Sequence, residues 1–279
     1  MTEEITSELD LFGSIIQQNI IENEFNREYA PLATIQHGEP IEFMVTGSND
    51  LYLDQNNTRL HVLAKITNAD GTNIGANTAG LINLPLHSMF REISVELNGR
   101  NVSDTSPLYP YRPYLETLLN YSNETQDTRL LCEGWTKDSS GNMGVTEVAD
   151  ANAGLNTRAV TFATSTVVEL VGRPHLDVFH QDRLIPPGID LIMKLIPAAD
   201  SFVCKLAAPA AGAAQQNYKM AIQRVNLISY TKQLTSTPQK AHMELLQVQN
   251  MRTHYSRVQV KQLSIPANQT SISFDNIFT

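Results

Sequence analysis

The chain has 279 residues, a formal net charge of -9 and 42% hydrophobic residues, which suits one or two globular domains with a sizeable core. The acidic balance and the lack of any Lys or Arg run argue against a protein that tracks nucleic-acid phosphates, so we expect no direct nucleic-acid contact. Nucleotide-binding, dinucleotide-binding and serine-hydrolase motifs do not occur in the sequence.

The N-terminal segment is predicted to be a helical arm. Over residues 8–24 its apolar side chains recur at steps of three or four, namely Leu9, Phe12, Ile16 and Ile20. Such an amphipathic helix either docks on its own domain or packs against neighbouring subunits, and the pattern fits both. Because the chain has neither a signal-peptide pattern nor ~20 consecutive apolar residues, we expect no membrane span and folding in a reducing compartment, with both cysteines as buried thiols.

From residue 29 onwards the chain reads as short strands, which indicates a β-sandwich. Strands are predicted at 32–35, 41–45 and 60–66, and the Asn, Asp and Gly residues of 68–80 predict a long surface loop. Next comes a hairpin, in which Ile93, Val95 and Leu97 alternate with polar residues before a type I′ turn at Asn98-Gly99.

A short helix is predicted after this hairpin. Pro113 suits a first helical position because it has no N–H to leave unpaired. Leu115, Leu118 and Leu119 fall at helical spacing on one face, and we expect the helix to dock on a sheet.

The second half of the chain predicts more strands separated by loops at 137–157 and at the Ala-rich 207–216. The strands are expected at 160–163, 167–170, 176–179, 191–195, 202–206 and 218–230. The pattern then starts again, with a helix at 238–248, a strand at 255–265, and a stretch, LSIPANQTSISF, that echoes LATIQHGEPIEF near the N-terminus.

The His and Asp residues between Arg173 and Asp182 form a cluster with the composition of a metal site. On a strand His175 and Asp177 would point the same way, but His180 would face the opposite side. The H-x-H pattern with a later Glu that a jelly-roll metalloenzyme would carry is absent, and no carboxylates are paired for glycoside hydrolysis. We therefore predict no metal, no cofactor, no catalytic residue and no enzymatic activity.

Three blocks in the middle of the chain carry a family resemblance, namely LNGRNVSD, YPYRPYLETLLNY and WTKDSSGNM. They resemble the corresponding stretch of the major capsid proteins encoded by polintons (Maverick elements) and polinton-like viruses. Further blocks in the same order extend the resemblance over roughly residues 27–279. It implies a double jelly-roll capsid subunit that forms trimers of pseudo-hexagonal outline.

Strand pattern and resemblance together predict an all-β fold, an antiparallel jelly-roll β-sandwich with a few short helices, plus the first strands of a second jelly roll. The predicted divisions are an arm at 1–26, the first jelly roll at 27–235, and a linker helix with opening strands of a second, incomplete jelly roll at 236–279. Because two leftover strands would expose unpaired edges, we expect a fragment, a shortened gene, or strands completed by another chain.

The resemblance implies a viral structural protein that self-assembles into an icosahedral shell. Expected partners are copies of itself, as homotrimers and neighbouring capsomers, and penton or minor capsid proteins. The expected location is the virion, after folding in the host cytoplasm or nucleus. Aromatic groups held by prolines contribute buried area at low entropic cost, so the candidate assembly residues are Tyr109, Pro110, Tyr111 and Tyr114. The alternative is a jelly-roll module that binds carbohydrate or another ligand.

Overall fold

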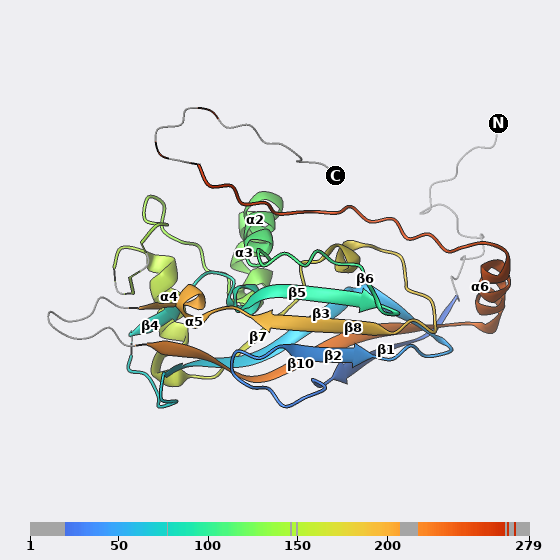
Figure 1. Ribbon diagram of the computed structural model, residues 1–279, viewed down its shortest axis with the longest axis horizontal. Helices are drawn as coiled ribbons and strands as arrows, with labels where there is room; N and C mark the ends of the chain where they lie inside the picture. The colour runs from blue at the N-terminus through green and yellow to red at the C-terminus, as the bar shows by residue number, and fades with distance from the viewer. Residues whose placement is uncertain are drawn as a thin grey trace, which may run out of the picture.

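Two stacked four-stranded sheets make up most of the molecule (Figure 1). The computed structural model describes residues 20–76, 78–145, 147, 148, 150–206, 217–265, 267 and 271. The first sheet has the order β1 (Ile21–Tyr29), β10 (Tyr218–Leu234), β3 (Leu51–Asn68) and β7 (Val168–Gly172). The second has the order β2 (Ile41–Val45), β8 (Leu191–Pro197), β5 (Phe90–Leu97) and β6 (Arg100–Asn101).

The strand order is that of a jelly roll. A third, two-stranded sheet pairs β4 (Ala79–Leu81) with β9 (Cys204–Leu206) at one end of the sandwich. When these two strands are set aside, the others, counted along the chain, read 1-8-3-6 in one sheet and 2-7-4-5 in the other. All neighbouring strands are antiparallel, so the predicted jelly-roll sandwich is confirmed.

Apolar side chains from alternate strand positions fill the space between the sheets. In β2, Ile41, Phe43 and Val45 are buried, whereas Glu42 and Met44 between them are not. The same period of two holds in β8 and in much of β3 and β10, because successive strand residues point to opposite faces and only one face of each sheet meets the core. The expected turn of the β5–β6 hairpin is also confirmed, since both of its residues have positive φ, 47° at Asn98 and 74° at Gly99.

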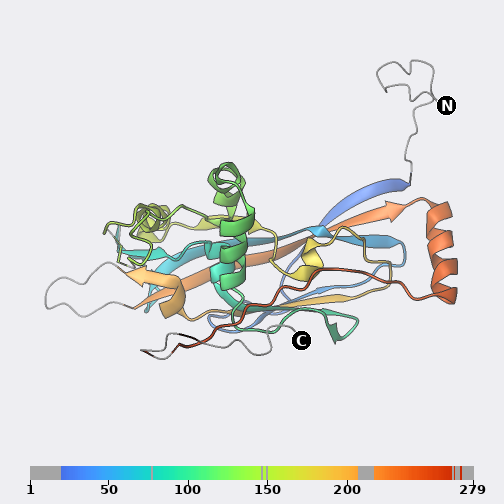
Figure 2. The same cartoon turned by 90° about the horizontal axis from the view of Figure 1, so that it is seen from above.

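Short helices occupy the connections between strands. They are α1 (Pro85–Ser88), α2 (Tyr111–Asn120), α3 (Asn123–Asp127), α4 (Ala153–Thr161), α5 (Asp200–Val203) and α6 (Ser236–Val248), with 3-10 turns η1 (Arg129–Glu133), η2 (Ala163–Ser165) and η3 (Asp177–His180). Helix α2 stands on the flank of the sandwich, and α6 lies at the end opposite α4 (Figures 1 and 2). In the described part of the chain no helix is both long and apolar enough to cross a membrane.

Two predicted strands are helical instead. The strand expected at 160–163 is the end of α4 and the start of η2, because Asn152 caps the helix by accepting the Leu155 N–H and Arg158 anchors it to the Leu81 carbonyl at 2.7 Å. The strand expected at 176–179 is η3. In α4 the Val160 side chain stays exposed.

Both ends of the sandwich differ from the predicted divisions. Strand β1 begins at Ile21, so residues 21–26 lie in the first sheet rather than in an arm, while residues 8–19 of the predicted helix are outside the described residues. Helix α6 is confirmed, but the strand expected at 255–265 forms no strand in the described chain. This segment runs extended along the flank towards α2, with no neighbouring strand to supply a ladder of hydrogen bonds (Figure 1).

The two cysteines lie in different environments. Cys204 is buried, and burial raises the pKa of its thiol to about 12. Cys132, which we also expected to be buried, is exposed on η1. The predicted loop at 207–216 lies outside the described residues.

Candidate functional site

Helix α2 packs on the sandwich through polar side chains. Arg112 and Thr117 are buried on its inner face, and Pro113 lies between them. The Arg112 guanidinium donates to Asp177 Oδ1 on η3 at 2.6 Å and to Glu116 Oε1, one helical turn later, at 2.8 Å. These ion pairs fix α2 to the loop that follows β7.

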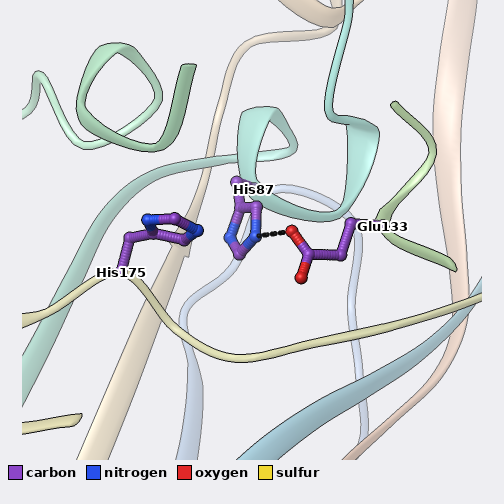
Figure 3. Close-up of side chains that lie close together, drawn as sticks. All are labelled: His87, Glu133 and His175. Carbon is purple, nitrogen blue, oxygen red and sulfur yellow. Dashed lines mark hydrogen bonds and ion pairs between the residues drawn. The ribbon is translucent and has the colours of Figure 1, made fainter. Parts of the chain in front are cut away.

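A second group of polar side chains continues inward from Glu116. Its other oxygen, Oε2, lies 2.6 Å from His175 Nδ1, and the Tyr109 hydroxyl accepts the His175 backbone N–H at 3.2 Å. The same hydroxyl lies 3.0 Å from His87 Nδ1 on α1, and His87 Nε2 lies 3.1 Å from Glu133 Oε2 at the end of η1 (Figure 3). The network therefore joins four segments that are far apart in the sequence.

Two glycines make room for Glu133. Gly134 ends η1 with φ of 82°, and a Cβ there would lie 2.3 Å from Pro85 Cγ, at the start of the helix that carries His87. A Cβ on Gly172 of β7 would lie 2.6 Å from Glu133 Cγ. Side chains at either position would push Glu133 away from His87.

Burial and pairing shift the pKa values of this network. Burial lowers the pKa of His175 to about 4, although the hydrogen bond with Glu116 acts in the opposite direction. Burial would raise the pKa of Glu116, but the His175 hydrogen bond and the Arg112 charge outweigh it and bring that pKa to about 2. At neutral pH a neutral His175 thus donates its Nδ1 proton to the Glu116 carboxylate, which can only accept, and keeps a lone pair on Nε2.

Two sets of side chains in the described residues have the composition of metal ligands. His87, Glu133 and His175 are all buried, and their ligand atoms lie within 4.8 Å of one another; Glu116, His175 and His180 form the second set. The expectation that His180 faces away from His175 is wrong, because η3 turns the chain and brings the two rings to 5.4 Å between centroids. Sequence reasoning singled out His175 but missed His87 and Glu133, which no local motif connects to it.

The outer face of α2 is apolar, so the predicted helix packs on the sandwich through its polar face and not through its leucines. Leu115, Leu118 and Leu119 are 46%, 44% and 80% exposed, and Tyr111 on the same face is 44% exposed. The helix is amphipathic as predicted, but its polar face is the buried one, because the ion pairs of Arg112 satisfy it.

The four predicted assembly residues divide into two pairs. Tyr109 and Pro110 are buried in the subunit, and Pro110 borders the groove that the other two residues line. Tyr111 lies at the surface with its ring 6.1 Å from that of Phe202, and Tyr114 is half-buried with its ring 5.8 Å from that of Trp135. Both line a shallow groove of about 280 Å³ beside α2.

The fold has counterparts among solved viral structures, although the sequence matches no protein-family model and no curated protein. A chain in the 3.5 Å cryo-EM structure of the Sputnik virophage has a TM-score of 0.55 at 8% identity, over 84% of this chain and 52% of that chain. A chain in the quasi-atomic model of the PBCV-1 virus capsid has a TM-score of 0.50 at 10% identity, over 82% of this chain and 46% of that chain. The chain thus spans about half the length of the structures it matches, and shares their fold.

Proposed function

We propose that this chain is the first jelly roll, with the start of the second, of a viral major capsid protein that self-assembles into an icosahedral shell. The observation that carries the proposal is the orientation of helix α2. It buries its polar face and turns Leu115, Leu118 and Leu119 towards solvent. A monomeric protein gains nothing from this arrangement, whereas a subunit in an assembly covers such a face with its neighbour. The likeness in fold to chains of the PBCV-1 capsid and the Sputnik virophage supports the same conclusion.

The C-terminal segment supports the proposed division into two jelly rolls. After α6 it stays extended and largely exposed, with apolar side chains at Tyr255, Val258, Leu263 and Ile265. Exposed strand-forming residues of this kind require partner strands, which a second jelly roll would supply. The chain length, about half that of the matched structures, fits this interpretation.

The finer features of the proposal follow from the resemblance in sequence. We place the protein in the polinton and polinton-like virus lineage, as a homotrimer of pseudo-hexagonal outline within the virion shell. Neighbouring capsomers and penton or minor capsid proteins would be its partners, after synthesis in the host cytoplasm or nucleus. In this arrangement Tyr111 and Tyr114 are the remaining candidates for contacts between subunits.

The test measures assembly directly. The protein expressed from its complete gene is examined by size-exclusion chromatography with light scattering, and its particles by negative-stain electron microscopy. We expect trimers and shells from the unaltered protein, and monomers when Leu118→Glu and Leu119→Glu are combined, because two charges would have to be buried at the contact. Leu32→Glu, at a 61% exposed leucine away from α2, is the matched control and should assemble.

Circular dichroism should show that both variants are folded, because the three leucines are exposed in the monomer. A monodisperse monomer from the unaltered protein, or shells from the α2 variant, would contradict the proposal.

A further inference from the structure

We propose that His87, Glu133 and His175 form a buried site for one transition-metal ion of the Zn²⁺ type. Two imidazoles and one carboxylate are a donor set that Zn²⁺ prefers. Mg²⁺ and Ca²⁺ instead require six or more oxygen ligands, which this site does not offer. The inference is independent of the proposed capsid function, because it concerns the interior of a single subunit.

The distances in the described structure are close to those of a metal site. With bonds of 2.0–2.2 Å, two ligand atoms on a tetrahedral Zn²⁺ are about 3.4 Å apart. His87 Nε2 and Glu133 Oε2 are already 3.1 Å apart, and all three ligand atoms lie within 4.8 Å of one another. His175 therefore has to approach by at most about 1.4 Å for its nitrogen to complete the triangle. Figure 3 shows that its ring already points towards His87.

Each histidine has its other ring nitrogen held by a neighbour. His175 Nδ1 contacts the Glu116 carboxylate, which Arg112 holds in turn, and His87 Nδ1 contacts the Tyr109 hydroxyl. Metal-binding histidines almost always have such an outer partner, which fixes the ring orientation and the tautomer. Here the outer partners leave Nε2 of both rings for the ion.

Three protein ligands leave the fourth tetrahedral position to a water molecule, and burial of all three side chains gives the ion a structural role. His87, Glu133 and His175 are 1%, 5% and 3% exposed, so no substrate could reach the ion. The ion would instead connect α1, η1 and the segment after β7, which are the segments that support α2. Its effect should therefore appear as stability of the folded subunit.

The experiment starts from the full chain, which is stripped with a chelator and then loaded with Zn²⁺. After gel filtration, elemental analysis should find one Zn²⁺ per chain, and Zn²⁺ at about 100 times its Kd should raise Tm by about 5 to 10 °C, whereas Mg²⁺ should not. Loading with Co²⁺ should give the visible absorption of a tetrahedral nitrogen and oxygen site, a readout that depends on no variant. Absence of bound Zn²⁺ together with a featureless Co²⁺ spectrum would overturn the proposal.

Variants then assign the ligands. Glu133→Gln and His175→Gln keep side chains of similar size and should each weaken Zn²⁺ binding at least 100-fold, and Glu116→Gln, whose side chain holds His175 Nδ1, about 10-fold. His180→Gln is the control for the second set of potential ligands, and Glu169→Gln controls for a surface pair in which Glu169 lies 2.8 Å from His61. Both controls should bind Zn²⁺ like the unaltered chain. Unchanged binding by Glu133→Gln, or loss of binding by His180→Gln, would show that the assigned site is wrong.

Discussion

The space between the two sheets and the layer beneath helix α2 are held together by different chemistry. Between the sheets, apolar side chains such as Phe43 and Leu60 are fully buried, and any shape that fills the space stabilises the fold. Beneath α2, Arg112, Asp177 and Glu116 form charged contacts that tolerate one arrangement only. The sandwich core thus supplies stability, while the polar layer fixes the orientation of one surface helix.

The largest difference between the regions should appear when one charge of the polar layer is removed. Asp177→Ala takes a hydrogen-bond partner from the buried Arg112 guanidinium and should lower the free energy of unfolding by about 3 to 5 kcal/mol. Combining Arg112→Met with Asp177→Leu removes both charges of this pair and should recover part of that loss, because Glu116 keeps His175 as its partner but loses Arg112. Urea titration at neutral pH measures all three proteins.

Phe43→Ala is the matched change in the apolar core and should also cost about 3 to 5 kcal/mol, because it leaves a cavity. A second substitution that only removes another contact should not restore the stability that Phe43→Ala loses. If the Arg112 and Asp177 double variant is as unstable as Asp177→Ala, the proposed contrast between the two regions fails.

A smaller effect should follow from acid. The folded pKa of His175, about 4, is below the ordinary 6.5, so the unfolded chain binds a proton that the folded chain does not. Stability is therefore complete above pH 6.5 and falls as the pH drops from 6.5 towards 4, by about 1 to 3 kcal/mol for this group. The low pKa of Glu116 adds a further loss between about pH 4.5 and 2, as that carboxylate becomes protonated.

Urea titrations of the unaltered chain and of His175→Gln between pH 7 and pH 4.5 separate the contribution of His175 from that of all other groups. The variant should show a flatter dependence of stability on pH over this interval. Equal slopes for the two proteins would mean that His175 is not held neutral by burial.

The smallest effect is expected on the outer face of α2. Leu119 is 80% exposed, so Leu119→Ser should change the free energy of unfolding of the monomer by less than about 0.5 kcal/mol. Thermal melts of dilute protein measure this change. A loss of several kcal/mol would mean that the Leu119 side chain packs inside the subunit.

The sandwich could be predicted from sequence because apolar and polar residues alternate along each strand, and this alternation shows which face is buried. Ile41, Phe43 and Val45 alternate with polar or exposed neighbours, and Asn98-Gly99 fixes its turn by local conformational preference. For α2, the spacing of Leu115, Leu118 and Leu119 showed which residues share a face. It could not show which face turns inward, because that depends on partners elsewhere in the chain.

The polar network was largely beyond sequence reasoning. His87, Glu133 and His175 are separated by more than forty residues at each step, and no periodic pattern links them. The predicted direction of the His180 side chain was wrong because a 3-10 turn replaces the expected strand. In this turn the side chains do not alternate between two faces as they do in a strand. The prediction of a strand at 255–265 was wrong, because a strand forms only beside another strand that accepts and donates its backbone hydrogen bonds. The periodicity of a segment does not show whether such a neighbour is present.

The C-terminal segment also contacts the polar layer, and it does so through its backbone. The Val258 N–H donates to Asp177 Oδ1 at 3.2 Å, and Arg112 Nη1 lies 3.5 Å from the Val258 carbonyl. Main-chain groups are present whatever side chain occupies the position, so substitutions of Val258 other than proline leave both contacts available. The position of α2 is thereby coupled to the path of the segment that follows α6, so a displacement of Val258 would disturb the ion pair that orients the leucine face.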